Sequence, residues 1–149
     1  MASLSEQLGG GEMRPKVIED ACKVLDQEVA DKGGLTGIAI KGAYKVLQGV
    51  KPGFVREVVD HLLDDFLKAL DPVYQEAAEK KRPAGQYLRE NSSRVADALL
   101  AVTDRRAVDA KRQMIRSAYD KLRPMAKKQV EAAAPRLADL VDRHAAKTG

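Results

Sequence analysis

Apolar residues recur at intervals of three and four from Phe54 to Leu70, which is the spacing of one helical face. The face is unusually broad and comprises Phe54, Val55, Val58, Val59, Leu62, Leu63, Phe66, Leu67 and Leu70. A face of this width needs cover from two sides. The preceding segment, residues 35–50, is also rich in apolar residues, and Lys51-Pro52-Gly53 separates the two. We therefore expect a helical hairpin around Pro52-Gly53 at the structural centre.

Glycines interrupt the first arm of this predicted hairpin at Gly37, Gly42 and Gly49. A glycine inside a helix costs about 0.5 to 1 kcal/mol relative to alanine, so three of them indicate a backbone that another element approaches closely. Gly42 and Gly49 are seven residues apart and share one helical face. Neither G-x-x-x-x-G-K-[ST] nor G-x-G-x-x-G is present, which favours close packing over phosphate binding.

The remaining segments also have helical periodicity, and no segment alternates convincingly with period two. One helix is predicted from Pro15 to about Lys32. Asp71 is predicted to cap a short helix that Pro72 opens, and Thr103 to cap a longer helix from Asp104 to Leu122. Arg123-Pro124 is expected to interrupt the chain before a last helix, which runs to about Ala146 with a kink at Pro135. The fold is therefore predicted to be all-α, a compact bundle of about six helices.

The length of 149 residues is that of one ordinary domain. Residues 1–13 contain Gly9-Gly10-Gly11 and are predicted to be a flexible tail, and residues 14–149 a single helical domain. The start lacks the pattern of a secretory signal, and no apolar run is long enough to span a bilayer. Cys22 is the only cysteine, on an apolar helical face, so nothing supports an oxidising compartment. We expect a cytoplasmic protein.

Charge is distributed unevenly along the chain. Residues 1–80 carry 10 basic and 14 acidic side chains, whereas residues 81–149 carry 16 basic and 8 acidic ones. Either the halves attract each other within the fold or a dimer, which we favour, or the basic half binds an anionic partner such as DNA or anionic lipid. The candidate contacts for such a partner are Arg105, Arg106, Lys111, Arg112, Arg116, Lys127 and Lys128.

The order of a short helix, a turn and this basic segment is loosely similar to a helix-turn-helix. Asp109 and Asp120 interrupt the basic face, and they would repel phosphate. Single-strand or RNA binding has less support, because aromatic residues are 4% of the chain and Trp is absent. Nucleic acid is thus the minority interpretation.

His61 is the one candidate for site chemistry, because Glu57, Asp64 and Asp65 can share its helical face. A single helix supplies too few ligands for a metal, so a solvated acidic face is the preferred interpretation. His144 is interpreted as a surface residue. The sequence shows no Ser-His-Asp or Cys-His pattern, although spacing alone does not exclude contacts formed in the fold. We predict no enzyme activity, no catalytic or metal site and no cofactor.

Two stretches resemble an uncharacterised family of short all-helical bacterial proteins. They are the residues from Gly33-Gly34-Leu35-Thr36-Gly37 through Lys51-Pro52-Gly53-Phe54, and Ala98-Leu99-Leu100-Ala101-Val102-Thr103-Asp104. The resemblance covers most of residues 15–141. It implies a helical fold and the same compartment, and it brings no assigned activity, cofactor or catalytic residue.

These observations predict a non-enzymatic helical interaction module, a scaffold or adaptor that self-associates or binds a protein partner. The alternative is a binder of anionic partners through the basic C-terminal half.

Overall fold

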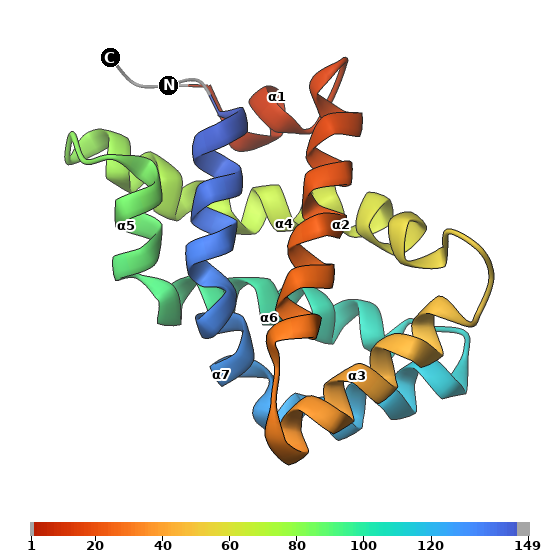
Figure 1. Cartoon of the computed structure of the whole chain (residues 1–149). Coiled ribbons are helices and arrows are strands. Elements are labelled where there is room, and N and C mark those ends of the chain that lie inside the picture. The colour runs from red at the N-terminus through yellow and green to blue at the C-terminus, as the bar shows by residue number, and fades with distance from the viewer. Residues whose placement is uncertain (1, 146–149) are drawn as a thin grey trace.

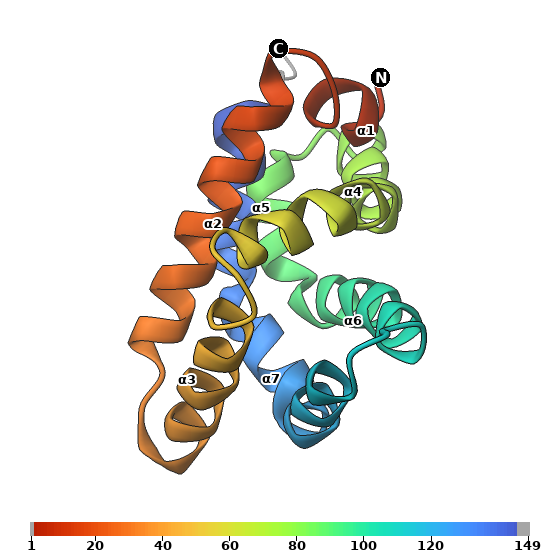
Figure 2. The same ribbon diagram turned by 90° about the vertical axis from the view of Figure 1, so that its right-hand side faces the viewer.

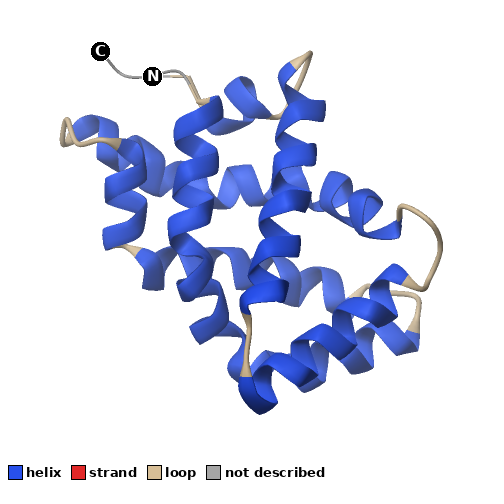
Figure 3. Ribbon diagram, viewed as in Figure 1, coloured by secondary structure: helices blue, strands red, loops and turns tan. Residues whose placement is uncertain are grey.

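The computed structural model describes residues 2–145, which form seven α-helices (Figure 1). Their bounds are α1 Leu4–Leu8, α2 Met13–Asp31, α3 Gly34–Gln48, α4 Phe54–Glu79, α5 Ala84–Glu90, α6 Ser92–Val108 and α7 Gln113–His144. Residues 2–145 contain no strand (Figure 3). The predicted all-α class is therefore confirmed.

Two crossing layers of long helices organise the molecule. α2 and the later part of α7 run side by side in one layer, and α4 and α6 run across them in the other (Figures 1 and 2). α5 packs against α7, while α1 packs against α2 and α4. α3 and the beginning of α7 lie together at the lower end in both views. None of the described helices combines the length and apolarity needed to cross a membrane.

The hydrophobic core lies where the two layers cross. All 22 buried hydrophobic side chains of the described chain belong to residues 2–32, 63–102 and 129–145, which we call the packed region. The second half of α4 contributes one side of this core, with Leu63, Leu67, Leu70, Val73, Tyr74 and Ala77. The expectation of a broad buried face thus holds for the end of α4, while Leu62 and Phe66 are only half-buried.

The N-terminal segment differs from the expected flexible tail. Residues 4–8 form α1, and the side chains of Leu4 and Leu8 are fully buried. The Asp71 carboxylate accepts a hydrogen bond from the Leu4 backbone N–H at 3.0 Å, and Ser3 caps the same helix through the Glu6 N–H. Five residues are too few to display helical periodicity, which is why the pattern did not reveal this helix.

Three predicted helix boundaries are absent from the structure. α4 continues through Asp71 and Pro72, α6 continues past Thr103, and α7 continues through Pro124. A proline removes one backbone donor and bends a helix, but packing on both sides keeps the helix continuous. α7 accordingly changes direction along its length (Figures 1 and 2). The prediction that the last helix persists through Pro135 is confirmed.

The expected central hairpin needs correction, because only its second arm is central. α3 lies at the edge of the fold, and among its residues only Gly37 is buried. A Cβ atom at Gly42 would meet no described atom within 4 Å, so the predicted close contact at Gly42 is wrong. Gly37 is the tightly packed glycine, since a Cβ there would lie 2.7 Å from the Lys32 carbonyl. Apolar residues on several sides of α3 made this helix resemble a core element.

The lower end of the molecule contrasts with the packed region. We call this end, residues 33–62 and 103–128, the open region. It comprises α3 with its flanking turns, the first turns of α4, the end of α6 and the first half of α7. None of the described chain's 22 buried hydrophobic side chains lies here. All five of its exposed large hydrophobic side chains do, namely Leu35, Ile38, Val46, Val108 and Met114.

Candidate functional site

The seven basic residues that we predicted to contact an anionic partner fall into two groups in the structure. Arg106 forms an ion pair with Asp65 of α4 at 2.7 Å, and Lys127 pairs with Asp97 at 3.1 Å. The other five are exposed and form no ion pair within residues 2–145; they are Arg105, Lys111, Arg112, Arg116 and Lys128. Four of these five flank the turn between α6 and α7.

Ion pairs do join the acidic and basic halves of the sequence, as the first interpretation of the charge pattern expected. Arg94 binds Glu76 at 3.0 Å, and Arg136 binds Glu28 at 2.9 Å. Because these pairs lie in the packed region, they leave much of the positive charge of the open region uncompensated. The open region contains 13 Lys and Arg against 5 Asp and Glu, whereas the rest of the sequence contains 13 against 17.

The open region gains its charge from both halves of the sequence. Lys41, Lys45 and Lys51 lie on or after α3, and Arg56 lies in α4. The fold brings these cations to the same end of the molecule as the start of α7, against which α3 packs. The sequence-based prediction confined the basic surface to residues 105–128, because it rested on the net charges of two consecutive halves of the chain.

A polar cluster fastens α6 to α7 inside the open region. Arg123 donates hydrogen bonds to both Asp104 oxygens, at 2.8 and 3.1 Å, and the Tyr119 hydroxyl contacts both Asp104 and Thr103. The hydrogen bonds from Arg123 and then Tyr119 lower the pKa of Asp104. Burial and the bond to Asp104 raise the pKa of Tyr119. Both shifts favour an ionised Asp104 and a neutral Tyr119, which are the states that form these hydrogen bonds. The cluster therefore has the properties of a structural contact between α6 and α7.

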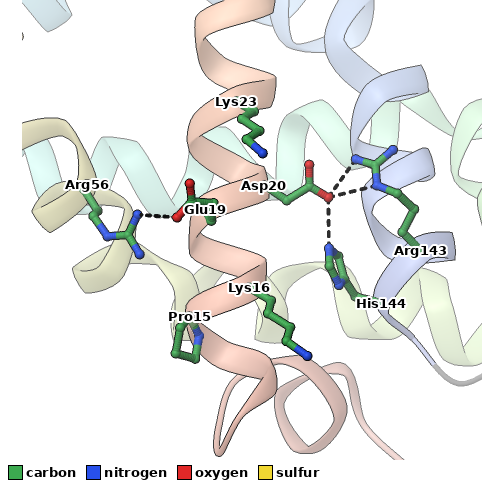
Figure 4. Close-up of a pocket in the computed structure, with 8 residues that line it drawn as sticks. All are labelled: Pro15, Lys16, Glu19, Asp20, Lys23, Arg56, Arg143 and His144. Atoms are coloured by element: carbon green, nitrogen blue, oxygen red, sulfur yellow. Dashed lines mark hydrogen bonds and ion pairs between the residues drawn. The ribbon is translucent and has the colours of Figure 1, made fainter.

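A surface pocket of about 530 Å³ lies between α2, α4 and α7 (Figure 4). Its lining is mostly charged and consists of Pro15, Lys16, Glu19, Asp20, Lys23, Arg56, Arg143 and His144. Glu19 pairs with Arg56 at 3.1 Å. Lys16 and Lys23 are exposed and form no ion pair within the described chain.

Asp20 is the centre of this pocket. Its carboxylate is largely buried and accepts hydrogen bonds from Arg143 and from His144, each at 2.9 Å (Figure 4). Burial raises the pKa of Asp20, but the bonds from Arg143 and His144 outweigh burial, so the pKa of Asp20 is lowered overall. An ionised Asp20 therefore holds the end of α7 against α2. The prediction of His144 as a surface residue missed this contact, because 124 residues separate the partners.

His61 does not join a cluster of metal ligands. Its side chain is exposed, and its Nε2 atom lies 3.9 Å from Glu57. Asp64 and Asp65 point to arginines instead, with Asp64 paired to Arg14 and Asp65 to Arg106. The described residues contain no group of three or more histidine, cysteine or carboxylate side chains placed to hold a metal.

Cys22 is half-buried and free. Burial raises the pKa of its thiol, which lowers the fraction of reactive thiolate. Its surroundings are those of a packing residue.

Comparison with known proteins places the chain in a family but gives it no activity. Neither a curated protein nor a solved structure matches it. The model of a family of unknown function, DUF6918, matches residues 4–145, which include all seven helices of the described chain. Over nearly its whole length, therefore, the chain belongs to family DUF6918.

Proposed function

We propose that this protein is a non-enzymatic cytoplasmic interaction module that binds an anionic partner through its open region. The observation that carries the proposal is the coincidence of exposed apolar side chains and unpaired cations at one end of the molecule. Exposed apolar residues that gather rather than scatter are typical of interaction surfaces. A surplus of eight positive charges in the same region selects a negatively charged partner.

The titratable clusters do not have the properties of a general acid. In the pocket, Asp20 is ionised and fully engaged by Arg143 and His144. In the open region, Asp104 is ionised and engaged by Arg123. A general acid needs a carboxyl whose pKa is raised towards neutral pH, and both of these carboxyls are shifted in the opposite direction.

Self-association is the second candidate, and the exposed face of α3 is the observation that favours it. A symmetric dimer through the open region would bring two strongly positive surfaces together, and charges in contact lie within the screening length of about 8 Å at physiological salt. The charge distribution therefore favours an anionic partner over a second copy in that arrangement.

A charge-reversal pair tests the proposal. Arg112→Glu with Arg116→Glu changes two exposed, unpaired cations of the open region. Lys16→Glu with Lys23→Glu is the matched control, because it makes the same change of net charge, from +4 to zero, on exposed residues of the packed region. Both variants are titrated with random-sequence duplex DNA and with anionic vesicles at about 50 mM and 200 mM salt, and light scattering gives their molar masses.

We expect the wild-type protein to bind at least one anionic probe with an affinity that falls as salt rises. The Arg112/Arg116 variant should lose this binding while the Lys16/Lys23 control retains most of it. Equal losses in both variants would mean that only net charge matters, and binding of neither probe would contradict the proposal. An oligomer that only the Arg112/Arg116 variant dissociates would favour self-association.

A further inference from the structure

We propose that the anionic partner is a lipid surface and that the outer face of α3 inserts into it. This inference rests on the proposed function, because it names the partner of the same open region. It is independent of the pocket around Asp20. It differs from nucleic-acid binding in requiring the apolar side chains of α3 as well as the cations.

The outer face of α3 is an apolar stripe. Leu35 is 87% exposed and Ile38 is 70% exposed, and Val46 follows on the same helical face. Gly42 lies between them with no described atom near its Cβ position, so the stripe is unobstructed. Neighbouring apolar side chains of this size rarely remain exposed on a protein surface unless a partner molecule or a membrane covers them.

Positive charge borders this stripe. Lys41 and Lys45 are exposed on one flank of α3, and no acidic residue occurs in the sequence between Asp31 and Glu57. An apolar face with lysines beside it is the pattern of a helix that lies in the interface of an anionic membrane. The lysines attract lipid phosphates, while the aliphatic side chains enter the boundary of the acyl chains.

Contacts on the inner face of α3 hold this helix in the fold and leave its outer face available to a lipid surface. The Tyr44 hydroxyl donates a hydrogen bond to Asp26 of α2, and the Gly37 backbone lies close to Lys32. α3 also packs against α7. Because these contacts hold α3 from the inside, Leu35 and Ile38 can enter a lipid surface without any helix unfolding.

The turn between α6 and α7 supplies a second contact of the same kind. Val108 and Met114 are exposed on its two sides, and Lys111 and Arg112 lie between them without ion pairs in the described chain. This turn and α3 belong to the same end of the molecule (Figures 1 and 2). Two separate elements thus combine apolar and cationic residues, as a lipid surface requires.

Nucleic acid fits this combination less well. A duplex offers phosphates to lysine and arginine, but it offers no environment that buries Leu35 and Ile38. The stripe also lacks Trp and Phe, so its insertion is shallow and the electrostatic contribution is essential. Neutral vesicles should therefore bind far more weakly than anionic ones.

Vesicle sedimentation with three proteins tests the inference. The full chain, the Leu35→Ser/Ile38→Ser variant and an Ala101→Ser/Ala132→Ser control are mixed with phosphatidylcholine vesicles containing no or about 30% phosphatidylglycerol. The control makes two exposed helical positions of the packed region polar without changing charge. Circular dichroism verifies that all three are folded, and the same proteins are titrated with duplex DNA.

The Leu35/Ile38 variant should lose on the order of tenfold or more in partitioning to anionic vesicles, while the control stays within about twofold. Unchanged vesicle binding by the Leu35/Ile38 variant would overturn the insertion of α3. DNA binding without vesicle binding would overturn the lipid partner and leave the proposed function intact. Failure of both probes would remove both proposals.

Discussion

The packed and open regions contain similar proportions of apolar residues but bury them to different extents. In the second half of α4, Leu67 is 3% exposed because α1, α2, α5 and α6 surround this helix. In α3, Leu35 is 87% exposed because neighbours lie only on the inner side. An apolar face therefore predicts burial only when the fold supplies a second layer to cover it.

The two regions also differ in what their charged residues do. In the packed region, long-range carboxylates anchor the short helices: Asp71 binds the start of α1, and Asp142 binds the Gly85 N–H in α5 at 3.0 Å. In the open region, most cations near the α6–α7 turn are exposed and form no ion pair within residues 2–145. Charged groups therefore anchor the short helices of the packed region, whereas several cations of the open region remain available to a partner.

The largest difference should appear when one leucine is truncated in each region. Leu67→Ala in α4 should lower the free energy of unfolding by about 2 to 5 kcal/mol, because it removes buried methyl groups and leaves a cavity. Leu35→Ala in α3 should change it by less than about 0.5 kcal/mol. Chemical denaturation measures both. Equal effects would mean that the distinction between the regions is false.

A second comparison uses two glycines of the same helix. Gly37→Ala places a methyl group 2.7 Å from the Lys32 carbonyl, so overpacking should cost about 1 to 3 kcal/mol and exceed the gain in helix propensity. Gly42→Ala faces open space and should stabilise by up to about 1 kcal/mol. Thermal unfolding of the two variants should give shifts of opposite sign. Stabilisation by both would contradict the close approach of the Gly37 backbone to Lys32.

The smallest expected effect concerns pH and the packed region. Hydrogen bonds from Arg94 and Tyr87 lower the pKa of Glu76 from 4.5 to about 2. A carboxyl whose pKa is lower in the folded state stabilises the fold above its unfolded pKa and loses this contribution as pH falls. Wild-type stability should therefore decline between about pH 4.5 and 2.

Glu76→Gln should weaken that decline, because it removes the group that titrates in this window. Glu79→Gln is the matched control: Glu79 is exposed in the next turn of α4 and forms no ion pair within residues 2–145. Urea midpoints measured across the window compare the three proteins. A decline of the same size in the Glu76→Gln variant would assign the pH dependence to other carboxyls.

The sequence was sufficient to predict the helical class and the broad face of α4, since both depend on local periodicity. It could not place α3, because periodicity tells which side chains share a face and not how many neighbours cover that face. The apolar residues of α3 therefore suggested a central position that the structure corrects. α1 was missed because its five residues are too few to display periodicity, and other helices bury its Leu4 and Leu8.

The candidate site was predictable only in part. The cations at Lys111, Arg112 and Arg116 were visible as a charge cluster in the sequence, and the structure leaves them exposed. Their grouping with α3 depends on a contact between α3 and α7, which no local pattern reports. The contact between Asp20 and His144 is equally invisible, because 124 residues separate the two partners in the sequence.

Hydrogen exchange with and without anionic vesicles tests the central claim most directly. Without vesicles, amides of α3 and of the α6–α7 turn should exchange faster than those of residues 63–77, because fewer buried contacts oppose their local opening. With vesicles, protection should rise in residues 34–48 and 108–116 and stay constant in residues 63–77. Equal protection of α3 and of residues 63–77 in the free protein, or vesicle protection confined to the packed region, would contradict the account.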